Sequence, residues 1–211
     1  MSRRSCWITL AWLCVSALGF AQQSEKNELG LTLGAEFVPE QQLVAPAGAK
    51  LNFSKSVVFG ANYARRLAAT NSAAFYLEFP FSAAPSHRIT STNPAAITNL
   101  ATLFVTPSLR VKFAPEAAVS PWISGGIGYG LLEGDQTLPG GARNPARHTS
   151  TATAQFGGGI DVRTPFRILA PISLRAEFRD FYTFNDLNYN TPTLDDRQHH
   201  LVLAGGFVLR F

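Results

Sequence analysis

The chain has 211 residues, of which 46% are apolar and only 15% are charged, a length that allows one domain or two small ones. The formal net charge is +4, and removing Arg3 and Arg4 with a leader would lower the Lys and Arg count from 18 to 16 against 14 acids, leaving +2. No run of basic residues remains, so the composition does not support nucleic-acid binding.

The first 21 residues have the three parts of a secretory signal peptide. A basic start precedes an apolar run over residues 7–20, and residues 19–21 (GFA) form a small-x-small cleavage site. The apolar run is too short for a spanning helix, and polar residues follow it directly. We therefore predict a cleaved signal peptide over residues 1–21, which carries both cysteines, and one domain over residues 22–211.

The mature sequence alternates apolar and polar residues in eight segments. In the first segment Leu29, Leu31 and Leu33 share one face, because successive side chains of a strand point to opposite sides. The eight predicted strands cover residues 28–37, a part of 50–64, 73–81, 101–113, 122–131, 151–163, 172–179 and 199–211.

Two prolines fit this pattern badly. Pro80 lies inside the third predicted strand and Pro107 inside the fourth. If the eight strands close into a barrel, neither proline has a free edge at which a missing N–H donor could be accommodated. We expect a bulge or a local break at Pro107.

The predicted connections alternate in length. Those after the second, fourth and sixth strands span about seven or eight residues, whereas the others, for example 82–100, 133–150 and 182–198, are longer and rich in Asn, Pro, Thr and Ser. Short turns at one end and long loops at the other are typical of outer-membrane β-barrels.

Three segments resemble parts of known outer-membrane barrels. The last strand, with Phe207, Leu209 and the terminal Phe211 on one face, resembles the closing strand of that class. Residues 121–129 (PWISGGIGY) and 174–181 (LRAEFRDF) resemble the fifth and seventh strands of small OmpA-like barrels. The resemblance implies an all-β fold, an eight-stranded antiparallel up-and-down transmembrane β-barrel in the outer membrane of a Gram-negative-type bacterium.

The same resemblance implies partners. The barrel would contact outer-membrane lipid and lipopolysaccharide, and Phe207, Leu209 and Phe211 would form the signal that the barrel-assembly machinery reads. We expect a monomer. Aromatic belts are expected at both rims, with Tyr63, Phe75, Phe113, Phe211 and the nearby Trp122 on the periplasmic side and Phe37, Phe81, Tyr129 and Phe178 on the outer side.

The inward faces of the predicted strands carry charges of both signs. An eight-stranded barrel is just wide enough for its inward side chains to fill it, and buried charges must be paired. We therefore predict a lumen plugged by a charge network, with glycines of the fifth and sixth strands leaving room for long side chains. The predicted members are Glu36, Glu78, Asp161 and Glu177 with Arg110, Lys112, Arg163, Arg175, Arg179 and Arg210.

One tripeptide carries possible catalytic chemistry. His148-Thr149-Ser150 resembles the His-x-Ser motif of lipid A deacylases, in which histidine activates serine and a carboxylate orients the histidine. Thr151 replaces the asparagine of that motif, and the next glutamate is the distant Glu177. We therefore keep His148, Ser150 and Glu177 only as weak catalytic candidates.

The other histidines are interpreted as solvated residues at loop ends. The adjacent His199 and His200 would point to opposite faces of a strand and cannot hold one metal ion together, and His87 falls in a predicted loop. We predict no metal site and no cofactor.

The sequence thus favours a non-enzymatic barrel with a structural or surface-interaction role. Two alternatives stay open beside the deacylase. The first is a narrow channel for small or hydrophobic solutes, similar to OmpW-type barrels. The second is a soluble exported lipid-binding barrel with its apolar face turned inward, because alternation alone does not say which face is inside.

Overall fold

The computed structural model describes residues 26–42, 50–92, 98–137, 140–144, 147–164, 172–184 and 197–211. The predicted signal peptide lies outside these residues. Within them, all regular secondary structure is β-strand. No helix in the described ranges is long and apolar enough to span a membrane.

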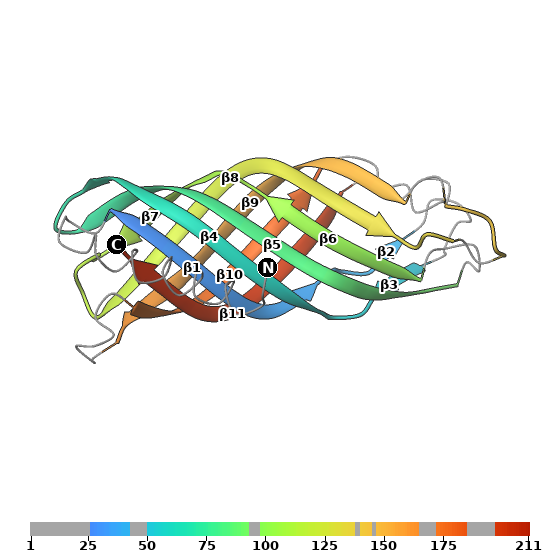
Figure 1. Ribbon diagram of the computed structural model, residues 1–211, viewed down its shortest axis with the longest axis horizontal. Coiled ribbons are helices and arrows are strands. Elements are labelled where there is room, and N and C mark those ends of the chain that lie inside the picture. The colour runs from blue at the N-terminus through green and yellow to red at the C-terminus, as the bar shows by residue number, and fades with distance from the viewer. Residues whose placement is uncertain are drawn as a thin grey trace, which may run out of the picture.

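The described strands form one closed antiparallel ring with eight strand positions, here called staves, some of which hold two consecutive strands (Figure 1). Two of the staves are interrupted: β6 and β7 follow one another in one stave, and β3 precedes β4 in another. The strands are β1 (Asn27–Phe37), β2 (Gln41–Gln42), β3 (Lys50–Phe53), β4 (Ser56–Ala69), β5 (Ala73–Ser91), β6 (Asn99–Val105), β7 (Ser108–Phe113), β8 (Val119–Gly134), β9 (His148–Arg163), β10 (Ile172–Thr183) and β11 (Gln198–Arg210). The predicted fold class is confirmed.

The ring closes where the first strand meets the last. β1 pairs with β4 on one side and with β11 on the other, in a register that runs from Glu28 opposite Arg210 to Phe37 opposite Leu201. Beyond this register, the backbone N–H groups of Asn27 and Phe211 each donate to the other residue's carbonyl, at 2.9 and 3.0 Å. Closure leaves the ring without a free edge.

The two prolines meet at one place in the wall. The stave of β6 and β7 is broken at Thr106 and Pro107, as expected, and β5 pairs with β6 from Phe81 onward but with β7 up to Glu78. Pro80 therefore lies beside the break, and its carbonyl accepts a hydrogen bond from the Thr106 N–H at 3.3 Å. A single interruption accommodates two residues that lack an N–H donor.

Turn lengths alternate as predicted, but the strands extend further at the long-loop end. Residues 70–72 join β4 to β5 and residues 114–118 join β7 to β8, whereas residues 135–147 separate β8 from β9. β5 continues to Ser91, so the first half of the predicted loop 82–100 is strand. Figure 1 shows β2 and β3 at this long-loop end.

The apolar face of the strands points outward. Leu31, Ile127 and Phe156 are 60%, 74% and 67% exposed, whereas polar residues such as Glu36 and Gln155 are buried inside the ring. This orientation is the opposite of the one required by the soluble lipid-binding alternative, because a soluble barrel turns its apolar side chains inward. The wall is apolar on the outside and the interior is largely polar.

The residues of the predicted aromatic belts do point outward, since Tyr63, Phe75, Phe113, Phe81, Tyr129 and Phe178 are all exposed, but they do not form two separated belts. Tyr63 pairs with Phe79 and Ala61 pairs with Phe81, so Tyr63 and Phe81, predicted at opposite rims, lie only two residues apart along the wall. Trp122 is wrongly assigned to the rim, because it has the parity of the inward side chains of β8 and is only 1% exposed.

A glycine at the closing seam tests how the ring closes. A Cβ on Gly206 would overlap the carbonyl oxygen of Leu31 in the paired strand, whereas at the neighbouring Gly205 the nearest atom would be a backbone oxygen 3.6 Å away. We expect Gly206→Val to prevent closure and Gly205→Val to allow it. The measurement is the mobility of refolded protein on a detergent gel with and without boiling. A fast unboiled band for Gly206→Val would contradict this account of the seam.

Candidate functional site

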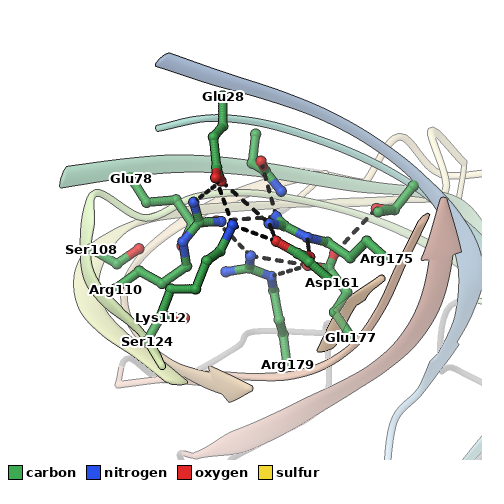
Figure 2. A network of polar contacts seen from close by, with 12 residues as sticks. Glu28, Glu78, Ser108, Arg110, Lys112, Ser124, Asp161, Arg175, Glu177 and Arg179 are labelled. Carbon is green, nitrogen blue, oxygen red and sulfur yellow. Dashed lines mark hydrogen bonds and ion pairs between the residues drawn. The ribbon is translucent and has the colours of Figure 1, made fainter. Parts of the chain in front are cut away.

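The interior between the middle of the barrel and the short-turn end is filled by a cluster of charged side chains, here called the ion-pair cluster (Figure 2). They come from five different strands and point toward one another across the lumen. Each is at most 5% exposed. The members are Glu28 of β1, Glu78 of β5, Arg110 and Lys112 of β7, Asp161 of β9, and Arg175, Glu177 and Arg179 of β10.

Glu28 joins the two cationic strands. Lys112 Nζ lies 2.6 Å from Glu28 Oε1, and Arg110 donates to Glu28 Oε2. Arg175 Nη2 lies 3.6 Å from the same carboxylate, and Arg210 Nε of β11 also approaches it to 3.6 Å. One carboxylate therefore faces four cations, and none of them is left alone in the interior.

Asp161 and Glu78 are the other two carboxylates that bind cations from different strands. Arg175 binds Asp161 through two parallel hydrogen bonds of 2.7 and 2.9 Å, the strongest geometry for this pair of groups. Lys112 Nζ lies 2.6 Å from Asp161 Oδ2. Glu78 accepts a hydrogen bond of 2.8 Å from Arg179, which also binds Glu177 at 3.1 Å on its own strand.

Aromatic rings support the cations from the side. Trp122 lies 4.9 Å from the Arg175 guanidinium and 5.1 Å from that of Arg179, within the range of cation–π contacts. Tyr76 lies 4.7 Å from the Arg110 guanidinium. The glycines of β9 make room, because a Cβ on Gly159 would come within 2.7 Å of the Trp122 ring.

The sequence prediction and the cluster differ in four members. Arg163 lies at the short-turn rim, where it binds Glu116 at 2.8 Å and the carbonyl of Pro115. Glu36 lies in a separate group toward the long-loop end. Glu28 was missed; its parity already placed it on the inward face, but parity does not say which charges meet across the lumen. Arg210 reaches the cluster only at its edge.

Glu36 belongs to a second group, here called the histidine cluster: Glu36, His87, Thr102 and His200. His200 Nδ1 lies 2.7 Å and His87 Nε2 3.4 Å from Glu36 Oε1, and the Thr102 hydroxyl lies 3.1 and 2.9 Å from the two carboxylate oxygens. Among the described residues, no group of three or more His, Cys, Asp or Glu side chains has a geometry that could hold a metal ion.

The prediction that His87 and His200 are solvated is wrong, because both are completely buried. His199 and His200 do point to opposite faces, and the outward His199 lies 2.7 Å from Asp180. His87 was misplaced because β5 extends past it and its pairing with β6 shifts register between Ala84 and His87. The shift moves the inward face from even to odd positions.

An apolar layer lies between the two clusters. On β5, Ala84 lies between Glu78 and His87, and on β10 Phe181 follows Arg179; the full layer is Val58, Ala84, Phe104, Phe181, Val202 and Ala204. The rings of Phe104 and Phe181 stack at 4.8 Å. A cavity lined by residues such as Asn62, Ser82 and Glu177 has a volume of about 10 Å³, space for roughly one water molecule.

The structure does not bring the three weak catalytic candidates together. His148 and Ser150 are exposed on the outside of β9, and the Ser150 hydroxyl lies 2.6 Å from that of Tyr129. Glu177 is inside the barrel, where it binds Arg179. The wall therefore separates the carboxylate from the other two groups.

A carboxylate also joins two connections at the long-loop end. Asp135 accepts hydrogen bonds from the backbone N–H of Thr98 at 2.6 Å and of Asn99 at 3.1 Å, and from the side chains of both. Partial burial acts to raise the pKa of Asp135, but these hydrogen bonds outweigh it and hold the pKa below its ordinary value. Because the folded pKa is lowered, this anchor is present above the ordinary aspartate pKa and is lost as the pH falls through the folded one.

The ion-pair cluster predicts that replacing the buried Asp161 destabilises the protein much more than replacing the exposed Glu116. Asp161→Asn keeps the side-chain volume but removes the bidentate partner of Arg175 and leaves Lys112 and Arg175 with only the Glu28 carboxylate, which two other cations share, so it should lower the free energy of unfolding by about 3–5 kcal/mol. Glu116→Gln breaks the exposed pair with Arg163 and should cost at most about 1 kcal/mol. Urea unfolding of the refolded protein, followed by the fluorescence of Trp122, measures both. Equal losses would contradict the buried network.

The Asp135 anchor predicts a local change. In Asp135→Ala the backbone amides of Thr98 and Asn99 should exchange with solvent faster at the same pH, and acidifying the native protein should lower their protection relative to the intrinsic exchange rate at each pH. Hydrogen exchange followed by mass spectrometry measures it, with Asp180→Ala as the control, because Asp180 contacts neither residue. Unchanged exchange at residues 98 and 99 would refute the anchor.

Comparison with known proteins gives the fold but no sequence family. No protein-family profile matches the chain, and no curated protein matches it in sequence. The outer membrane protein OprG from Pseudomonas aeruginosa is similar in structure, with a TM-score of 0.54 and 12% identity over 90% of this chain and 98% of that one. Neisserial surface protein A (NspA) has a TM-score of 0.52 and 13% identity over 89% and 98%. The chain therefore has the fold of the small outer-membrane β-barrel proteins.

Proposed function

We propose that this protein is an integral outer-membrane barrel of a Gram-negative-type bacterium, with its short turns and termini in the periplasm and its long loops outside. The orientation of the wall supports the proposal, because an apolar outside and a closed ring satisfy what a bilayer requires of a spanning sheet. The exposed Phe75 and Phe113, which lie beside the short turns, fit one interface of such a membrane.

We further propose that the lumen is closed and that the protein acts in envelope structure or surface contact, through its outer loops. The carrying observation is the filled interior: the ion-pair cluster, the apolar layer and the histidine cluster follow one another along the barrel. The described lumen cavity of about 10 Å³ is too small for a continuous water path. Side-chain charges that are neutralised by a partner also bind a permeating ion weakly, so they do not provide binding sites along a conduction path.

The enzymatic alternative has little geometric support. His148 and Ser150 lie on the outside of the wall and Glu177 on the inside, so the carboxylate that would orient the histidine is not available from Glu177. We therefore propose a non-enzymatic protein. The outward positions of Phe207 and Leu209 on β11 are compatible with their proposed part, together with Phe211, in recognition by the barrel-assembly machinery, and we propose a monomer.

A planar-bilayer recording separates the closed barrel from the channel. We expect no discrete conductance steps from the refolded protein, because the three layers close the lumen in series. A known channel protein inserted by the same protocol is the positive control, and unboiled gel mobility establishes that the sample is folded. Reproducible single-channel steps from the folded protein would replace the closed barrel with the solute channel.

A further inference from the structure

An apolar groove crosses the outer wall toward the long-loop end. It lies over four neighbouring staves and has a volume of about 270 Å³. Small side chains from β5 and β6 form its floor and larger ones its sides: Ala83, Pro85 and Ala101, and Phe59, Leu103 and Leu131.

The strand register places these side chains next to one another. Phe59 pairs with Ala83, Ala83 with Leu103, and Leu103 with Leu131, so one row of outward side chains crosses the four staves. The row lies two residues beyond Phe81 and Tyr129, which both pair with Val105, in the direction of the long loops. The irregular pairing of β5 after Ala84 adds Pro85, a residue with no long side chain, to the floor.

A cationic hollow lies next to the groove, at the base of the connection between β8 and β9. Its volume is about 400 Å³, and its lining is Gln136, Arg143, Asn144, Arg147 and His148. Hydrogen bonds hold its frame: the Gly134 N–H donates to the Arg147 carbonyl at 2.8 Å, and the Asn144 N–H donates to the Gln136 carbonyl at 2.9 Å. The hollow is therefore built by paired backbone rather than by free side chains alone.

Glu133 connects the two hollows. It lines the groove, pairs in register with Ala101 and with His148, and forms an ion pair with Arg147. This pair neutralises one of the two arginines of the hollow. Arg143 and His148 form no ion pair with any residue in the described ranges, and Arg147 Nε is buried without a hydrogen-bond partner among them.

We propose that the groove and the hollow together bind one molecule of a phosphorylated, acylated lipid of the outer leaflet. An acyl chain fits the apolar groove, and the phosphate of the same molecule fits the Arg143 guanidinium and the His148 ring directly beyond it. The alternative of a free anion explains the hollow but leaves the groove without a use. The site rests on the proposed membrane location, because only there does a lipid headgroup lie at the level of the hollow.

The test uses the refolded mature protein in detergent micelles, after unboiled gel mobility has shown that it is a folded barrel. Three probes are titrated and followed by native mass spectrometry: a diacyl phosphatidic acid, a phosphatidylcholine with the same chains, and glycerol phosphate. We expect phosphatidic acid to bind about tenfold or more tightly than phosphatidylcholine, because its phosphate monoester carries more negative charge and is not neutralised by the quaternary ammonium group that phosphatidylcholine carries. Glycerol phosphate should bind weakly.

Three variants divide the site. Arg143→Gln combined with His148→Gln should remove the preference for phosphatidic acid. Ala101→Trp should fill the groove and weaken the binding of both phosphatidic acid and phosphatidylcholine. Arg88→Gln is the matched control, an exposed cation at the same end of the barrel but outside the hollow, and it should change nothing. Arg147 is left intact because its replacement would remove the ion-pair partner of Glu133.

The outcomes are distinct. A folded barrel without preference for phosphatidic acid, or one whose preference survives the double variant, overturns the lipid site and leaves the proposed function standing. Glycerol phosphate binding as tightly as phosphatidic acid, unaffected by Ala101→Trp, overturns it in favour of a free anion site. A protein that is soluble and shows no boiling-dependent mobility overturns the proposed function itself.

Discussion

The wall of this barrel is a single β-sheet, and its backbone N–H and C=O groups form hydrogen bonds only with neighbouring strands. In the proposed membrane location, hydrocarbon offers no replacement for a missing hydrogen bond, so a sheet there has to close on itself. Closure at β1 and β11 is therefore the constraint on which the other features depend. It turns each strand into a boundary between two environments, and alternate residues must suit opposite sides.

The narrow interior follows from the number of staves. Eight strands leave space for side chains and almost none for water, so each charge that faces inward needs a partner from another strand. Long cations of β7 and β10 cross to carboxylates of β1, β5 and β9, and glycines on β9 leave room for Trp122 and Arg179. The polar interior supplies structure here, because its ion pairs join strands that share no backbone hydrogen bonds.

Interruptions of the alternation give the barrel its individual features. Pairing between β5 and its neighbour is interrupted beside Pro80 and Pro107, so the N–H donors that these two prolines lack are not required there. The register shift after Ala84 turns His87 inward to Glu36 and opens the floor of the outer groove. Parity counting assigned most inward charges correctly. His87 was predicted to lie in a loop, and parity counted from the start of β5 would have placed it outward, because one extra residue in a strand exchanges the two faces from that point onward.

The sequence by itself determined the strand number, the closed antiparallel fold, the alternation of turn lengths and the face on which most side chains lie, because these follow from a period of two and from local turn residues. Only the tertiary structure decided which face is outside, that Glu28 rather than Arg163 completes the ion-pair cluster, and that two histidines converge on Glu36. The reason is physical: a face is a local property of one strand, whereas a contact across the lumen depends on the register and tilt of all eight staves together.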